Sequence, residues 1–183
     1  MAFHENLNED LQAFIKEQKV FFTGTAGMEG KVNVSPKGMD TFRIIDPLRV
    51  MWLNLTGSGN ETAAHLLENG RITIMFCSFE GKPKILRLYG KGRSIHRHDQ
   101  KWSDYITMFP HMLSARQIID IRIELIQTSC GFGVPLYEYK GQRDQLPKWA
   151  DSKGEEGIKE YWKEKNLVSL DGKKTGILSD TDD

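Results

Sequence analysis

Cysteine is scarce in this chain of 183 residues, which has two, Cys77 and Cys130. They lie far apart and lack the spacing of CxxC motifs or of mixed Cys/His zinc sites. The sequence therefore predicts no metal site, and it favours a reduced, cytoplasmic setting.

Net charge and long apolar runs are also missing. The chain has 25 Lys and Arg against 25 Asp and Glu, so its formal net charge is zero. A neutral chain lacks the basic surface that attracts nucleic acid or anionic membranes. No apolar run approaches the roughly 20 residues that span a bilayer, and the N-terminus has no signal-peptide pattern. We therefore expect no nucleic-acid partner and no membrane partner.

Short apolar and alternating segments dominate the rest. Segments 20–26, 31–35, 42–45, 48–55, 71–79, 84–97 and 119–125 have the composition of strands. Helical spacing is confined to three or four short segments, at 7–15, 61–69, 102–109 and around 158–162. Because this order is not an alternation of strands and helices, it favours a mainly β, β-rich α+β fold, an antiparallel Greek-key barrel with short flanking helices.

Three residues are expected to set element boundaries. Pro36 is expected to stop the strand that begins at Lys31. Asn60 is the expected N-cap of the helix at 61–69, and Gly70 is the expected stop. Gly90 and Gly92 interrupt the segment 84–97 and predict bulges or barrel bends.

The loop 56–62 is the strongest candidate binding site. It is small, polar and glycine-rich, and it leads into a helix start, where free N–H groups favour a phosphate. The residues of the loop that are candidates to bind the phosphate are Thr56, Ser58, Asn60 and Thr62. Lys37, one strand earlier, is a candidate source of positive charge. The alternative is an ordinary strand-to-helix turn capped by an asparagine.

Four stretches together resemble the pyridoxamine 5′-phosphate oxidase-like proteins, which are FMN-binding split β-barrels. They are VNVSPKG (32–38), WLNLTGSGNETAAHL (52–66), NGRITIMF (69–76) and LRLYGKGR (86–93). The resemblance covers about residues 5–130. It implies an FMN-binding split β-barrel over residues 1–145, with residues 146–183 as a helical extension and acidic tail of the same domain.

The resemblance also implies roles for residues outside the loop. Lys37 matches the lysine that ends the family's second-strand motif, and we expect it near the flavin ring or phosphate. Asn33 and Ser35 share one strand face and are candidates to hydrogen-bond the ring edge; a solvent-facing polar stripe is the alternative. Arg87 is a candidate for bidentate phosphate contact, with a surface charge as the alternative.

One departure bears on the reaction. Where the oxidases carry an Arg-Lys pair near the helix start, this chain has Glu61 and Thr62. This points away from a true pyridoxamine phosphate oxidase. We expect an FMN-binding flavoprotein, a flavin-dependent oxidoreductase acting on an unknown small-molecule substrate. A deazaflavin-dependent reductase and a non-catalytic flavin- or haem-binding protein remain alternatives. No acid–base residue stands out, so the catalytic residues are unassigned.

The resemblance finally implies a homodimer, because family relatives cover the flavin with a second subunit. Two predicted helices offer apolar faces for an interface, one with Trp102, Tyr105, Ile106 and Phe109 and the other with Ile158, Tyr161 and Trp162. We expect one face to be buried between protomers, with the loop 130–135 reaching across.

Overall fold

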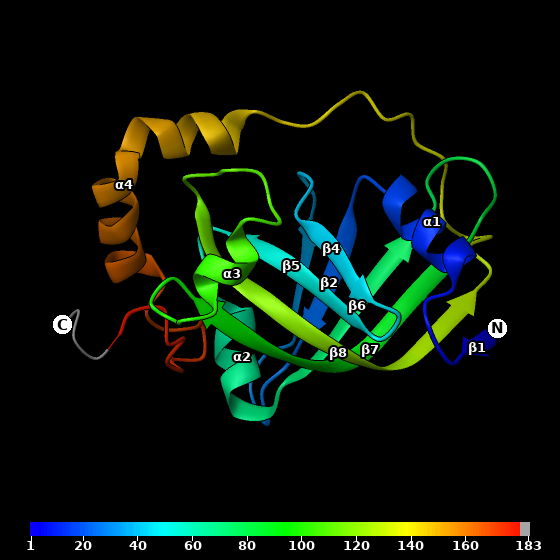
Figure 1. Ribbon diagram of the computed structural model, residues 1–183, viewed down its shortest axis with the longest axis horizontal. Helices are drawn as coiled ribbons and strands as arrows, with labels where there is room; N and C mark the ends of the chain where they lie inside the picture. Colours follow the sequence, from blue (N-terminus) through cyan, green and yellow to red (C-terminus); the bar gives the residue numbers. More distant parts are fainter. Residues whose placement is uncertain (180–183) are drawn as a thin grey trace.

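A single antiparallel sheet of eight strands forms the centre of the molecule, whose computed structural model describes residues 1–179 (Figure 1). The strands are β1 Ala2–His4, β2 Phe21–Thr25, β3 Asn33–Lys37, β4 Phe42–Asp46, β5 Arg49–Leu55, β6 Arg71–Cys77, β7 Ile85–His96 and β8 Ala115–Ser129. Their order is β3-β2-β6-β7-β8-β5-β4, and β1 pairs with β8. The sheet curls into a barrel that stays open between its edge strands β3 and β4. The mainly β prediction is confirmed.

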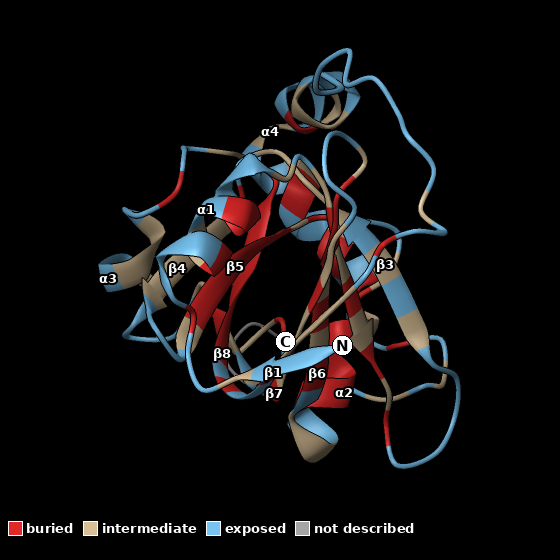
Figure 2. Ribbon diagram, turned by 90° about the vertical axis from the view of Figure 1, so that its right-hand side faces the viewer, coloured by how far each residue is buried: buried red, intermediate tan, exposed pale blue. Residues whose placement is uncertain are grey.

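Four helices flank the sheet: α1 Glu9–Glu17, α2 Glu61–Asn69, α3 Trp102–Ile106 and α4 Gln145–Lys165. The barrel interior is apolar and includes Phe21, Trp52 and Phe76, and buried segments of several strands surround it in Figure 2. Alternate residues of β5, Met51 and Leu53, face outward into a second core that packs against α3. Because β5 is buried on both faces, its run is nearly all apolar.

The end of α2 and the start of α1 follow from local chemistry. Gly70 has φ +70° and donates its N–H to the Leu66 carbonyl, which ends α2 after Asn69 as expected. Asn8 caps α1 by accepting from the Leu11 N–H at 3.0 Å. The bounds predicted for α2 are confirmed.

Pro36 does not stop a strand, so this prediction is wrong. It lies inside β3, opposite Phe22. Because β3 is an edge strand with one hydrogen-bonded neighbour, a residue without an N–H is tolerated there. The glycine prediction is confirmed at Gly90, where the pairing of β7 with β8 shifts register. A side chain on Gly90 would overlap the Arg122 carbonyl.

The C-terminal helix is longer than expected and is not a free surface. α4 runs for 21 residues and bends at Gly154, where φ is +67°. Its residues Ile158 and Trp162 are buried against the chain itself, and Phe109 after α3 is buried as well. Each predicted interface face thus contributes to the core of its own chain, because the sheet alone leaves its outer apolar residues uncovered.

Residues 166–179 return from α4 across the loop 56–62 toward the hairpin of β2 and β3 (Figure 1). An antiparallel bridge between Val168 and Lys174 shapes this segment, and Asp171 pairs with Lys31 at 2.8 Å. Of the predicted acidic tail, residues 180–183 lie outside the described residues. Among residues 1–179, no helix is both long and apolar enough to cross a membrane.

Candidate functional site

Polar side chains of β3 gather on the inner face of the barrel. Pairing with Thr25, Thr23 and Phe21 of β2 places Asn33, Ser35 and Lys37 on that face. The Asn33 amide donates to the Thr62 hydroxyl at 3.2 Å, and the Ser35 hydroxyl donates to the Asn33 side chain at 3.3 Å. The structure therefore brings four of the predicted site residues, Asn33, Ser35, Lys37 and Thr62, to one region.

Asn60 occupies the N-cap position of α2 but makes no side-chain cap bond. Its amide oxygen instead accepts from Gln117 at 2.8 Å inside the barrel. Within residues 1–179, the N–H groups of Ser58 and Gly59 donate to no acceptor. The helix start thus keeps free donors of the kind that bind an anion.

The other two loop hydroxyls have different surroundings. Thr56 is buried, donates to the Ser114 carbonyl at 2.9 Å and accepts from the Trp162 indole at 2.9 Å. Its hydroxyl is therefore engaged inside the chain. Ser58 is exposed at the loop surface. Glu61 accepts from the Leu170 N–H at 2.9 Å, so its carboxylate is turned to the C-terminal segment.

Arg116, at the start of β8, is a residue that sequence reasoning missed. It is 3% exposed, and one of its terminal nitrogens donates to the Gly59 carbonyl at 2.9 Å and to Asn166 at 2.7 Å. Its Nε is buried without a partner. Burial lowers the pKa of the guanidinium to about 9.

Lys37 is a second, half-buried cation. Its amine lies 5.1 Å from the centre of the Trp52 ring. Burial, and then the charge of Arg116, lowers the pKa of Lys37 to about 8. In the described part of the chain, neither Lys37 nor Arg116 has an ion-pair partner within 4.0 Å. Glu61 attracts Arg116 only from beyond ion-pair distance. Two cations withdrawn from water without a direct ion pair are costly to the fold, and an anionic ligand would offset that cost.

Arg87 lies apart from this cluster. Its neighbours Leu86 and Leu88 are buried inside the barrel, so Arg87 faces outward, where it donates to the Ser129 hydroxyl at 3.1 Å. One copy of the chain does not bring it to Lys37, and its predicted phosphate contact stays a prediction.

A signal for Arg116 was present in the sequence. Ile119, Ile121 and Ile123 occupy alternate positions of the strand, and Gln117 is the next such position toward the N-terminus. β8 indeed begins at Ala115, so Arg116 lies on it. The prediction began the strand too late, at Ile119. No local pattern, however, shows that Arg116 would be buried, because its cover comes from loop 56–62 and from Asn166.

The histidines form no metal centre in the described part of the chain, where no group of three or more His, Cys, Asp or Glu is placed to hold an ion. His96 and His98 stack with ring centres 5.3 Å apart. Burial lowers the pKa of His96 to about 4, so this ring is neutral near pH 7.

Comparison with known proteins identifies the family. A family model described as pyridoxamine 5′-phosphate oxidase matches residues 7–130. The pyridoxamine 5′-phosphate oxidase family protein ustO of Aspergillus flavus is 37% identical over 190 residues, which cover 93% of this chain and 76% of the relative.

Two solved structures share the fold. A variant of HupZ from Group A Streptococcus has a TM-score of 0.55 at 17% identity, covering 67% of this chain and 99% of that one. A candidate pyridoxamine 5′-phosphate oxidase from Lactobacillus delbrueckii has a TM-score of 0.55 at 16% identity, covering 69% and 99%. The predicted split β-barrel is thereby confirmed, and the chain belongs to the pyridoxamine 5′-phosphate oxidase family.

Proposed function

We propose that the protein binds FMN and is a flavin-dependent oxidoreductase that acts on a small-molecule substrate. The observation that carries this proposal is a pair of cations, the half-buried Lys37 and the buried Arg116, beside a helix start with free N–H groups. A phosphate dianion matches both features. Family membership supports a flavin over other phosphorylated ligands.

The residues fit such a group in three ways. Arg116, Lys37 and the N–H groups of the loop 56–62 suit the phosphate, and Arg116 supplies charge that Glu61 and Thr62 do not. Asn33 and Ser35 are the candidate contacts of the ring, because they share the inner face of β3. The bound flavin would supply electron transfer, while these side chains would hold it and keep water away.

We also propose a homodimer in a reducing, cytoplasmic setting. The free cysteines Cys77 and Cys130 support the setting. Val32 and Val34 are 72% and 66% exposed along the edge strand β3, and Phe132 is 82% exposed in the loop 130–135. Apolar residues beside an open sheet edge favour contact with another chain. Sedimentation at micromolar concentration tests this; a monomer with full FMN stoichiometry would contradict it.

The test of the proposed function is a titration of apo-protein with FMN and with riboflavin. We expect FMN to bind at least tenfold more tightly, because riboflavin lacks the phosphate. Equal affinities would contradict the proposal. The absorbance spectrum of the purified protein separates flavin, deazaflavin and haem, and reduction of the bound flavin by a nicotinamide cofactor separates an oxidoreductase from a carrier.

A further inference from the structure

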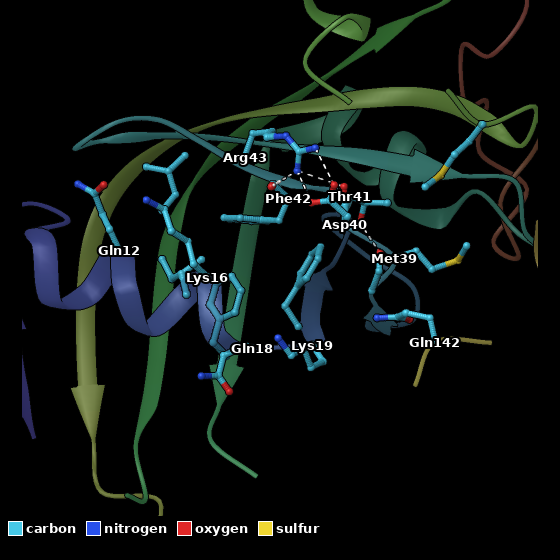
Figure 3. A pocket seen from close by; sticks show the side chains of 16 residues that line it. Gln12, Lys16, Gln18, Lys19, Met39, Asp40, Thr41, Phe42, Arg43 and Gln142 are labelled. Atoms are coloured by element: carbon cyan, nitrogen blue, oxygen red, sulfur yellow. Dashed lines mark hydrogen bonds and ion pairs between the residues drawn. The ribbon is translucent and has the colours of Figure 1, made fainter. Parts of the chain in front are cut away.

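A cavity of about 760 Å³ opens at the seam of the barrel, between α1 and β4. We call it the seam pocket; side chains of α1, β2, β4 and β6 line it, together with the turn 38–41 (Figure 3). Lys37 and Arg116 do not line it. It is therefore a separate cavity from the cation cluster, and its size lies in the range of small-molecule sites, roughly 300–1,000 Å³.

Three phenylalanines form an apolar floor in the seam pocket. The rings of Phe21 and Phe42 are 5.0 Å apart, those of Phe42 and Phe76 are 5.1 Å apart, and those of Phe21 and Phe76 are 5.6 Å apart. Two of these contacts are edge-to-face. Phe76 is 1% and Phe21 4% exposed, whereas Phe42 is half-buried. The accessible part of the floor is therefore Phe42 with a small part of Phe21, and a further aromatic ring can stack or pack edge-to-face there.

The charged side chains of the pocket that lie outside ion pairs are both positive. Lys16 and Lys19 lie on it, and within residues 1–179 neither takes part in an ion pair. Arg43 and Asp40 also line the pocket, but they pair with each other at 2.7 Å. The two lysines are thus the available charges, and both are positive.

The lip of the pocket is a strained and firmly held turn. Met39 and Asp40 both have left-handed backbone conformations, with φ of 67° and 52°. Arg43 donates to the Asp40 carboxylate and carbonyl, and the Thr41 hydroxyl donates to the Gly38 carbonyl at 2.7 Å. Two such residues in succession, neither of them glycine, cost free energy that functional sites often retain.

The seam pocket also adjoins the candidate cofactor region. Its lip begins at Gly38, directly after Lys37, and Phe21 on its floor contacts Trp52, with ring centres 6.2 Å apart. Trp52 is the ring below the Lys37 amine. A molecule on the phenylalanine floor would therefore lie one aromatic residue away from the flavin site of the proposed function.

We propose that the seam pocket binds a small aromatic carboxylate, with its ring on Phe21 and Phe42 and its carboxylate at Lys16 and Lys19. As the assignment of a substrate class, this rests on the proposed function. Binding of the carboxylate itself needs no flavin, so the two proposals fail separately.

The test uses 2-naphthoate and its neutral analogue 2-naphthalenemethanol, titrated by calorimetry into the protein with and without FMN. We expect 2-naphthoate to bind at least tenfold more tightly than the alcohol. The double variant Lys16→Gln/Lys19→Gln should bring the two affinities within threefold of each other. The matched control Lys82→Gln/Lys101→Gln, at two exposed positions away from the pocket, should keep the difference.

A second variant tests the floor. Phe42→Leu should weaken both compounds by a similar factor, because it removes an aromatic surface and no charge. Absence of 2-naphthoate binding at millimolar concentration would overturn the proposal, as would an affinity that the double lysine variant leaves unchanged. If 2-naphthoate binds while FMN does not, the pocket assignment stands and the proposed function fails.

Discussion

Two groups of cations in the molecule differ in their ion pairing: Arg49 and Arg93 around Asp120, and Arg116 with Lys37. Asp120 accepts from Arg49 at 2.8 Å and from Arg93 at 3.0 Å. Burial alone would raise the pKa of Asp120, but the hydrogen bonds from both arginines outweigh it and lower the pKa. Arg116 lies four residues earlier and is more deeply buried than Arg49 or Arg93. Among residues 1–179, no carboxylate lies within 4.0 Å of it.

This difference in pairing suggests two roles: the Asp120 ion pairs stabilise the fold, whereas Arg116 and Lys37 are placed to bind an anionic ligand. The Asp120 group joins β5, β7 and β8, and both of its arginines bond to one shared carboxylate. These charges thus have a role in holding the three strands together. Arg116 and Lys37 make no such ion pairs among residues 1–179, and removal from water disfavours their charged forms. Without a ligand, their charges therefore do not stabilise the fold as the Asp120 group does. An anionic ligand explains why both are retained at one place.

The largest expected effect is on FMN affinity, when Arg116 is replaced. Arg116→Met should weaken FMN about a hundredfold, equivalent to about 3 kcal/mol, because the phosphate loses a charged hydrogen-bond donor. Riboflavin affinity should change less than threefold. Arg116→Lys should restore part of the loss, since it restores the charge. Arg93→Met is the matched control and should leave both affinities unchanged.

The next largest effect is on the free energy of unfolding, when Asp120 is replaced. Asp120→Ala should lower the free energy of unfolding by about 2 kcal/mol, because it leaves Arg49 and Arg93 without their shared carboxylate. Urea denaturation measures this. Asp144→Ala, which removes an exposed helix pair with Lys148, serves as the control and should cause a much smaller change. A loss at Asp120 no larger than at Asp144 would remove the contrast between the two groups.

A third prediction sharpens the comparison through pH. Because Lys37 has a pKa of about 8 in the folded chain against an ordinary 10.5, the unfolded chain binds more protons between these values. The stability of the apo-protein should therefore rise by about 1 kcal/mol between pH 7 and pH 9, relative to Lys37→Met. Bound FMN should remove this rise, because a phosphate keeps Lys37 protonated. An identical pH profile in Lys37→Met would contradict the burial of a charged lysine.

The smallest effect concerns the outer member of the paired group. Arg93 has a side chain that is 58% exposed, and Asp120 keeps Arg49 when Arg93 is removed. Arg93→Gln should therefore change the free energy of unfolding by less than about 0.5 kcal/mol, as for most exposed ion pairs. A loss in urea denaturation as large as that of Asp120→Ala would show that Arg93 is the main partner.

The sequence predicts those parts of the fold that local chemistry decides. The end of α2 follows from Gly70, and the bulge in β7 follows from Gly90. The start of α2 lies at the expected position, although the Asn60 side chain makes no cap bond there. The strand end predicted at Pro36 is wrong because an edge strand such as β3 tolerates a proline. The edge position of β3 is a property of the whole sheet, which the local sequence does not show. The alternation of Asn33 and Ser35 predicts that they share a face, but only the pairing with β2 shows that this face is inward. The hydrogen bond between Thr56 and Trp162 likewise depends on a helix far away in the sequence.

Arg116 and the C-terminal segment were beyond sequence reasoning for the same reason. A guanidinium is buried here because Gly59 and Asn166, distant in sequence, both accept from it. Composition treats such an arginine as a surface charge, and only the three-dimensional arrangement reveals that it is unpaired.

The most direct test of the central claim is the number of protons that FMN binding takes up. Calorimetry at pH 8 in buffers of different ionisation enthalpy measures it. With the pKa of Lys37 at about 8, the free protein is half protonated at this position, and the phosphate should draw in about half a proton. Riboflavin should draw in none, and neither should FMN with Lys37→Met. FMN binding without proton uptake, or with the same uptake as riboflavin, would contradict an anion site built on Lys37 and Arg116.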